Sequence, residues 1–526
     1  MRLVKASRIL AALQKSSTSA VAPQVAGRIA ALAGVDERQA TLLAARLSPA
    51  QTAGLAVLPD VWPIPGTEPA AAEMDGASAV RRVLLAAALS VTDRADILLA
   101  ATATDTRVVL SEPVRRSLRF AAGRYRFLSE RTRSEILADA DPAVTESLHR
   151  ALWRAHRARG LSNPGLWHAL HGTADADSRI ARELVGFGER VLAAGNADAA
   201  FRIATAGVER GDAPTRARAA LLGGRAALAL GCFEDAIRGF EAALRSAASV
   251  TAGKTGELRS AAEQGLRAAT AFVVGPEPDA DPLARVAEQL PHLSAAAVTA
   301  SDRAAVAAAL EIADVWWTAP QDVDELHARL YLGVIPTPEP WPWNSTPGPL
   351  SPLIEAYLRG QQTGFLLHAG QPGESARVLR DALIRLPMTH IGGGVTLSAV
   401  EALHGVMPDL QLGFGEALRR VRPQRHVDYD VRRDADGEST AAASRASRAI
   451  AGPRLDILSA LTEREAAVVD LLAEGLRNRE IGARLGISER TIEVHLSNAF
   501  RKLGVRNRAE MLARILRDGA PPAGSA

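Results

Sequence analysis

The chain has 526 residues, of which 47% are apolar, 23% are charged and 4% are aromatic, and its formal net charge at pH 7 is +3. This balance is typical of a folded chain of several domains, and it excludes a disordered chain, a collagen-like chain and a uniformly basic coat for nucleic acid. The single cysteine, Cys232, excludes an internal disulfide framework and a cysteine-based zinc site. Any DNA-binding surface must therefore be local.

The N-terminal residues MRLVKASRILAALQK contain a short apolar run at 9–13, which is too short for the core of a secretory signal. Further along, no stretch approaches the roughly 18 uncharged apolar residues that a membrane span needs. We therefore expect a soluble, cytoplasmic protein without a membrane partner.

Nearly every segment carries Ala, Leu, Arg and Glu at helical spacing, so the sequence predicts an all-α fold. A first helical unit spans 1–58, and a Pro/Gly linker at 59–78 follows because its prolines exclude a continued helix. Residues 79–175 contain short amphipathic helices, and Tyr125 and Phe127 alternate as in a short strand. We predict a small winged-helix-like domain there.

Residues 176–417 carry an internal repeat signal. Small and aromatic residues of LLGGRAALALGCFEDAIRGFEAAL occupy the positions of a tetratricopeptide-type helical hairpin: Gly224, Gly231, Phe233, Ala236, Phe240, Ala243 and Leu244. Gly195 and Ala200 lie 36 residues before Gly231 and Ala236, close to that repeat's period of about 34. Gly370 and Ala376 mark a looser hairpin. The repeat predicts a solenoid of roughly three to five helix pairs.

A proline-rich segment, IPTPEPWPWNSTPGP at 335–349, interrupts this solenoid. Its Trp341 and Trp343, together with Trp316 and Trp317, either rim a concave ligand pocket or fill a junction between helix pairs. The second interpretation is favoured because most aromatic side chains belong to cores. After the repeats, residues 418–456 are charged, rich in Ser and Ala and without periodicity, which predicts a flexible linker.

The segment 457–519 has the most complete set of helix-start and helix-end signals in the chain. A disordered tail is expected after it, at 520–526. Two pairs with capping-box spacing and two further N-cap residues mark the helix starts: Thr462 with Glu465, Asn507 with Glu510, Asn478, and Ser488. These signals predict four short helices near 463–474, 479–485, 489–503 and 508–517. The tight connection between the second and third is typical of a helix-turn-helix domain.

Periodicity divides the third of these helices into two faces. Its apolar stripe is predicted to face the core and consists of Ile492, Leu496, Ala499, Phe500 and Leu503. The opposite face holds Arg490, Val494, Ser497 and Arg501, flanked by Glu493 on one side and by Thr491, His495, Asn498 and Lys502 on the other. Between Ser488 and Arg508, five basic residues stand against two acidic ones. Such a helix fits the major groove of double-stranded DNA, with Ser488 and Arg501 among its phosphate contacts.

Four motifs, LTEREAAVVDLLAEG, NREIGARLGIS, ERTIEVH and RKLGVRNRAE, resemble the LuxR-type helix-turn-helix domain, also called GerE or NarL type. The resemblance implies that Glu493, Val494 and Ser497 face bases and that Arg490, Thr491, Asn498 and Lys502 lie at phosphates. Glu493 stands where many members carry Lys or Arg, so its carboxylate either accepts from a cytosine amine or turns outward. The resemblance also implies a homodimer on DNA, formed by the last helix through Met511, Leu512, Ile515 or Leu516.

Upstream, LSPAQTAGLAVLPD, RYRFLSERTRSEIL, the LWHAL run and the helical repeats resemble the later parts of the large ATP-binding LuxR regulators related to the maltose regulator. Those parts follow the nucleotide-binding core of such proteins. The resemblance therefore implies a regulator that lacks the ATPase core.

No segment predicts catalysis. The nearest match to a Walker A loop, AGKTG at 252–256, has Ala248 where the first glycine is needed and no strand before it. The run ILLAATATD, which ends at Asp105, is interpreted as a buried helix rather than a Walker B strand. Four histidines, His149, His156, His168 and His171, lie within 23 residues, but no carboxylate or cysteine completes a zinc spacing. We expect no catalytic residue, no metal, no cofactor and no enzymatic activity.

The sequence predicts a bacterial, sequence-specific DNA-binding transcriptional regulator whose helical repeats sense a small-molecule or protein effector. Two alternatives stay open at this point. One is a signal-transducing ATP-binding NTPase of the LuxR type with a degenerate site. The other is a repeat scaffold in which DNA binding is secondary.

Overall fold

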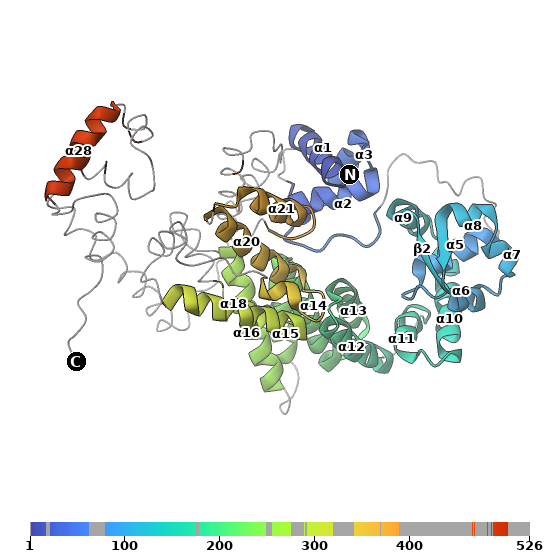
Figure 1. The fold of residues 1–526 in the computed structure, drawn as a ribbon. Coiled ribbons are helices and arrows are strands. Elements are labelled where there is room, and N and C mark those ends of the chain that lie inside the picture. Colours follow the sequence, from blue (N-terminus) through green and yellow to red (C-terminus); the bar gives the residue numbers. More distant parts are fainter. Residues whose placement is uncertain are drawn as a thin grey trace. The chain divides into compact units, whose positions relative to one another are not determined.

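A computed structural model gives the fold of the chain in two compact units. One comprises Met1–Val315 and Leu330–Gln424, and the other comprises Trp316–Arg329 and Arg425–Ala526. The structure describes residues 2–16, 21–62, 79–173, 178–248, 255–274, 292–318, 341–368, 370–388 and 488–502, and the single positions 289, 403, 465, 468, 481 and 485. Helices make up most of these residues, as the sequence predicts (Figure 1).

Four helices form the N-terminal part of the first unit: α1 (Arg2–Ser16), α2 (Pro23–Ala33), α3 (Glu37–Ala44) and α4 (Pro49–Thr52). The first three pack on one another and bury Ile9, Ile29 and Leu43 almost completely. Local chemistry sets the start of α4, where Ser48 and Gln51 form a reciprocal capping box. The sequence therefore positions this small cluster through apolar spacing and helix caps.

The chain beyond α4 packs against the helical repeats instead of leaving the body at once. The Val57 amide donates to Asp235 Oδ2 at 2.7 Å, and the Asp60 carboxylate accepts from Arg202 at 2.9 Å. Trp62 is 2% exposed. Residues 59–62, predicted as the start of a linker, are thus held by ion pairing and by burial of a large aromatic ring. The rest of that predicted linker, 63–78, lies outside the described residues.

The next part of the first unit combines short helices with one hairpin. Its elements are α5 (Ala79–Leu89), α6 (Ala95–Thr102), α7 (Thr106–Val109), α8 (Glu112–Ser117), β1 (Leu118–Ala121), β2 (Arg124–Phe127), α9 (Glu130–Ala138), α10 (Pro142–Ala158) and α11 (Ser162–His171). The strand predicted at Tyr125 and Phe127 is present as β2, and it pairs antiparallel with β1. Ala122 and Gly123 join the strands with φ of 48° and 74°, as a tight two-residue turn requires.

Tyr125 of β2 packs the hairpin against the neighbouring helices. Its ring is 6% exposed in a core with Leu98 and Leu118, and its hydroxyl donates to the Thr92 carbonyl at 3.0 Å. Burial raises the pKa of the Tyr125 phenol to about 12. The run ending at Asp105 forms α6, with Ile97 buried, so its interpretation as a buried helix is confirmed.

The four histidines come together where α10 packs on α11. His149 Nδ1 lies 2.9 Å from His168 Nδ1, and His156 and His171 have their rings within 5.3 Å of one of these two. Burial lowers the pKa of all four, that of His149 to about 4. Among the described residues, no group of His, Cys, Asp and Glu has the geometry of a metal site. The histidines are therefore neutral core residues near pH 7.

Five consecutive helices form the middle of the first unit: α12 (Ser178–Ala193), α13 (Ala197–Arg210), α14 (Ala213–Leu230), α15 (Phe233–Ala248) and α16 (Thr255–Val274). Each packs on the next (Figure 1). Gly231 ends α14 with φ of 76°, and a Cβ at Gly224 would lie 2.8 Å from the Phe240 ring. The glycines thus permit the tight turn and the close approach that the hairpin motif predicts. Whether these pairs form a tetratricopeptide-like solenoid stays a prediction.

The last described helices of the first unit follow the same pattern of paired helices. They are α18 (Ala300–Thr318), the short 3₁₀ helix η1 (Pro342–Ser345), α20 (Pro352–His368) and α21 (Pro372–Leu383). Trp341 and Trp343 are 4% and 3% exposed, and their ring centroids lie 4.8 Å apart. They fill a junction, the interpretation favoured from the sequence. The side chains of Trp316 and Trp317 lie outside the described residues.

Two further observations bear on function. The AGKTG segment follows α15, which is a helix and not a strand, and its residues 252–254 lie outside the described residues. Within the described ranges, none of the helices combines the length and the apolar character that crossing a bilayer requires.

Candidate nucleic-acid interface

The second unit contains α28 (Glu489–Lys502), which is the third of the four helices predicted near the C-terminus. Ser488 precedes it, and its hydroxyl accepts from the Thr491 amide at 3.2 Å. The Ser488 and Thr491 hydroxyls also lie 2.7 Å apart. Ser488 is therefore the N-cap that the sequence predicts, and it satisfies one of the helix's free amides.

The inner face of α28 follows the predicted apolar stripe. Ile492 and Ala499 are fully buried, and Leu496 is 5% exposed. Val468 and Ile481, from the segments predicted to form the first two helices, are also buried. The side chains of Phe500 and Leu503 lie outside the described residues. Periodicity alone thus assigns the described part of this face correctly.

The outer face of α28 exposes an apolar side chain between polar ones. Val494 is 54% exposed, and Thr491, His495 and Asn498 are half-buried around it. A helix that presents a small apolar group beside amide and hydroxyl groups can meet a thymine methyl and the polar edges of bases in the major groove.

Three of the predicted contact residues have their side chains outside the described residues: Arg490, Glu493 and Ser497. Their backbone belongs to α28, so they occupy the helix positions that the sequence assigns to them. The predicted dimer residues Met511, Leu512, Ile515 and Leu516 lie wholly outside the described residues.

Two adjacent basic residues at the end of α28 have different surroundings. Arg501 is exposed, and its guanidinium donates to Asn498 Oδ1 at 3.0 Å, which leaves its charge uncompensated by this contact. The Lys502 ammonium lies 2.6 Å from Glu465 Oε2, and the Glu465 side chain is 6% exposed. A phosphate contact by Lys502 therefore requires an ion pair to open, whereas the described contact of Arg501 is a hydrogen bond to a neutral amide.

Sequence reasoning missed the Glu465–Lys502 pair. It placed Glu465 in a capping box and Lys502 at a phosphate, two local interpretations of residues that lie 37 positions apart. No short-range pattern joins them, because the contact depends on how the first helical segment packs on α28. The cations near the carboxyl end of α28 also interact favourably with the helix dipole.

Comparisons with known proteins concern this C-terminal region. The family described as "Bacterial regulatory proteins, luxR family" matches residues 459–515. The spore germination protein GerE of Bacillus subtilis is 44% identical over 59 residues, which are 11% of this chain and 80% of GerE. The nitrate/nitrite response regulator protein NarP of Escherichia coli is 49% identical over 61 residues, which are 12% of this chain and 28% of NarP.

A third relative is the transcriptional regulatory protein UhpA of Escherichia coli, 49% identical over 59 residues, which are 11% of this chain and 30% of UhpA. The chain thus spans less than a third of the length of NarP and of UhpA. No solved structure gives a significant match to the chain.

Proposed function

Since the chain belongs to the luxR family of bacterial regulatory proteins, with its helix-turn-helix domain at the C-terminus, we propose that it is a sequence-specific DNA-binding transcriptional regulator. The observation that carries this proposal is the division of α28 into a buried face, which holds Ile492 and Ala499, and an exposed face around Val494. The exposed face is the part that enters the major groove of a bacterial promoter.

In this proposal Glu493, Val494 and Ser497, which occupy one side of α28, contact the bases. The Val494 side chain contacts a thymine methyl, and Ser497 is small enough to let the helix approach base edges. At Glu493 the carboxylate accepts from a cytosine amine or turns outward.

The residues that contact phosphates lie at the margins of this face: Ser488, Arg490, Thr491, Asn498, Arg501 and Lys502. Ser488 and Thr491 lie at the amino end of α28, where backbone amides and the helix dipole favour an anion. Arg501 supplies a guanidinium at the other end, and Lys502 contributes only when it leaves Glu465.

The remaining parts of the proposal concern assembly and control. The chain acts as a cytoplasmic homodimer on DNA, with Met511, Leu512, Ile515 and Leu516 at the two-fold interface. Its helical first unit, 176–417 above all, senses a small-molecule or protein effector. The resemblance of this unit to the later parts of large ATP-binding LuxR regulators supports a sensory role.

The test separates base readout from phosphate binding. Sites are selected from a random pool of double-stranded DNA with the full chain and with Val494→Ala and Ser497→Ala. Both variants should prefer a different base at one position, with a loss on the original site of roughly 1–3 kcal/mol. Arg490→Ala should weaken binding to every site and lower the slope of log affinity against log salt by about one.

The matched control is Arg38→Ala, an exposed arginine of α3 in the first unit. It should leave both the selected site and the salt slope unchanged. Unchanged selection by Val494→Ala and Ser497→Ala would contradict the assignment of this face to base readout.

A further inference from the structure

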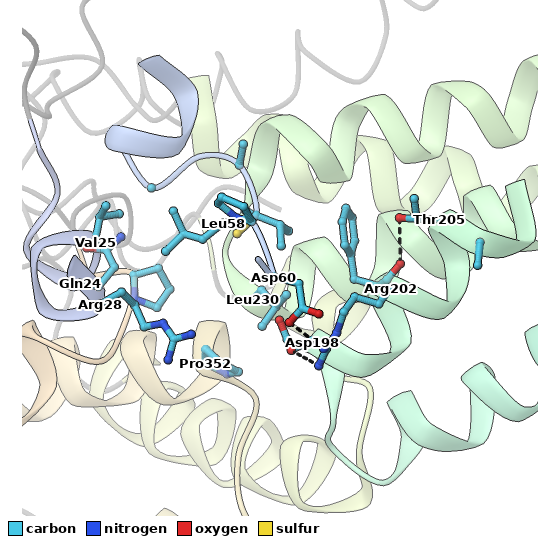
Figure 2. A pocket seen from close by; sticks show the side chains of 18 of the residues that line it. Gln24, Val25, Arg28, Leu58, Asp60, Asp198, Arg202, Thr205, Leu230 and Pro352 are labelled. Carbon is cyan, nitrogen blue, oxygen red and sulfur yellow. Dashed lines mark hydrogen bonds and ion pairs between the residues drawn. The ribbon is translucent and has the colours of Figure 1, made fainter. Parts of the chain in front are cut away.

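The first unit contains a cavity of about 690 Å³ where the N-terminal helices meet the helical repeats. Its lining comes from α2, from residues 54–60, from α11 and α13, from the start of α20, and from the chain at the end of α14 and after α21 (Figure 2). This volume lies within the range of roughly 300–1,000 Å³ that is typical of small-molecule sites. The cavity is separate from α28, which belongs to the other unit.

Much of the cavity wall is apolar. Val25, Leu58, Phe201 and Leu230 contribute side chains from four different segments, and Trp167 adds an aromatic ring from α11. Such a wall favours a ligand with a hydrocarbon or aromatic body, because its apolar surface leaves water on binding.

One buried polar group in the lining has no hydrogen-bond partner among the residues that the structure describes. Both the Nε2 and the Oε1 of Gln24 are buried and make no hydrogen bond to any described residue. An unpaired amide in a protein interior costs free energy, because the buried group has lost its hydrogen bonds to water. A ligand with a polar head at this wall would remove that cost when the Gln24 amide turns towards the cavity.

The same wall carries positive charge. Arg28 lies one turn after Gln24 on α2, and its guanidinium has no hydrogen-bond or ion-pair partner among the described residues. Arg385 lines the cavity just after α21, next to Ile384, and its guanidinium also contacts Glu355 Oε1 at 3.3 Å and donates to the Asp381 carbonyl at 2.9 Å. A side chain at Gly27 would lie 2.6 Å from the Ile384 carbonyl oxygen, so α2 and the end of α21 are in close contact here. This contact brings the two arginines to one wall.

The acidic residues of the lining belong to the opposite side, and two of them are already engaged. Figure 2 shows Asp60 and Asp198 bound to Arg202, away from Arg28. Arg202 donates to the two carboxylates at 2.9 and 2.6 Å. Glu209, near the end of α13, is exposed to solvent. The cations of the Arg28 wall are therefore not neutralised across the cavity by Asp60 and Asp198.

We infer that this cavity binds a small organic anion with an apolar body, whose acidic head lies at Arg28, with Arg385 and the Gln24 amide beside it. The apolar body lies against Leu58, Phe201 and Trp167. This inference deepens the sensory part of the proposed function and rests on that proposal for its biological meaning. Binding itself does not depend on the DNA-binding assignment.

The experiment uses three probes that share one body and differ in the head group: phenylbutyrate, phenylbutanol and phenylbutylamine. Each is titrated into the full chain by calorimetry, with Trp fluorescence as a second readout because Trp167 lines the cavity. Phenylbutyrate should bind at one site, at least tenfold more tightly than phenylbutylamine, because a charge-assisted hydrogen bond contributes about 1.5–3 kcal/mol.

Two variants and one control locate the site. Arg28→Met should weaken phenylbutyrate at least tenfold and leave phenylbutanol unchanged. Thr205→Trp, an enlargement of an exposed lining residue on α13, should weaken all three probes. Arg38→Met, which changes an exposed arginine of α3 outside the cavity, should change none of them.

Several outcomes would overturn the inference. They are equal affinities for the acid and the amine, equal effects of Arg28→Met and Arg38→Met, unchanged binding by Thr205→Trp, and no saturable binding of any probe. DNA binding by the same preparations is measured without probes. If the chain binds DNA but none of the probes, the anion site is rejected and the DNA-binding proposal stands. If it binds phenylbutyrate but not DNA, the DNA-binding proposal is rejected and the anion site stands.

Discussion

The repeat helices α12–α15 and the C-terminal helix α28 both carry many arginines or lysines, yet they place these charges differently. On α12–α15 many of the arginines are paired with carboxylates of the same or a neighbouring helix or its N-cap: Arg182 with Asp212, Arg218 with Glu189, Arg202 with Asp198, and Arg238 with Asp235. On α28, the described partner of Arg501 is the neutral Asn498 amide, and the carboxylate that holds Lys502 comes from another segment.

This difference explains how a chain with a net charge of only +3 can carry a DNA-binding surface. Exposed ion pairs such as those of α12–α15 stabilise little, about 0–1 kcal/mol each, but they neutralise the surface on which they lie. A guanidinium that is bonded to a neutral amide, as Arg501 is to Asn498, remains available to a phosphate. The arrangement of charges therefore matters more for this function than their number.

The largest expected effect comes from the two faces of α28. Ile492→Asp places a carboxylate at a fully buried position and should destabilise the helix-turn-helix domain by about 4 kcal/mol or more. DNA binding should be lost because the domain unfolds. Hydrogen–deuterium exchange of the full chain should show residues 489–502 unprotected and α12–α15 unchanged.

Val494→Asp is the matched control, since Val494 lies two positions further on and is 54% exposed. It should also abolish DNA binding, by repulsion from the phosphates, while the exchange protection of 489–502 stays at the level of the unmodified chain. Equal loss of protection in the two variants would contradict the separation of the two faces.

The buried histidines give the first unit a pH dependence, because protonation of His149 should destabilise it. The pKa of His149 falls from about 6.5 to about 4 on folding. Between pH 6.5 and pH 4, His149 is therefore protonated in the unfolded chain but stays neutral in the folded chain. The stability is fully present above pH 6.5 and is lost as the pH falls towards 4. At pH 5 the loss from His149 alone should be about 2 kcal/mol.

Urea unfolding of the full chain at pH 7 and pH 5 measures this loss of stability. Hydrogen–deuterium exchange in α10 and α11 at the same two pH values shows that the loss occurs around the histidines. His149→Gln should be less stable at pH 7, because it loses the contact with His168, but its stability should fall less steeply between the two pH values. Parallel losses in the variant and the unmodified chain would show that His149 does not titrate in this range.

Local patterns predicted much of α28 and of the helix turns. Ser488 was identifiable as an N-cap, and Ile492 and Leu496 as core residues, because capping and periodicity involve neighbours within a few positions. The turn glycines Gly195 and Gly231 do have positive φ, for the same reason.

Contacts between distant segments were not predictable in this way. The packing of residues 55–62 on the repeats brings Asp60 to Arg202, 142 positions away, and closes one side of the cavity. The pairing of Glu465 with Lys502 is of the same kind. Each of these two contacts depends on how two distant segments pack together, and the sequence of one segment does not determine that packing by itself.

The smallest expected effects distinguish Arg501 from Lys502, which are adjacent in the sequence. Arg501→Ala should leave the stability of the second unit unchanged and reduce DNA affinity a few-fold, with a salt slope lower by about one. Lys502→Ala should instead destabilise the second unit by about 1 kcal/mol, because the buried Glu465 carboxylate loses its ion pair with the lysine. The lysine is 35% exposed, so water replaces part of the contact and keeps this cost small.

Salt-titrated DNA binding and urea unfolding of both variants measure these effects. Glu465→Gln in the Lys502→Ala background should restore most of the lost stability, because a neutral amide needs no cation. If Lys502→Ala lowers the salt slope by one and leaves unfolding unchanged, then Lys502 binds a phosphate in the complex. Its pairing with Glu465 would in that case contribute no measurable stability to the free protein, and Arg501 and Lys502 would act alike on DNA.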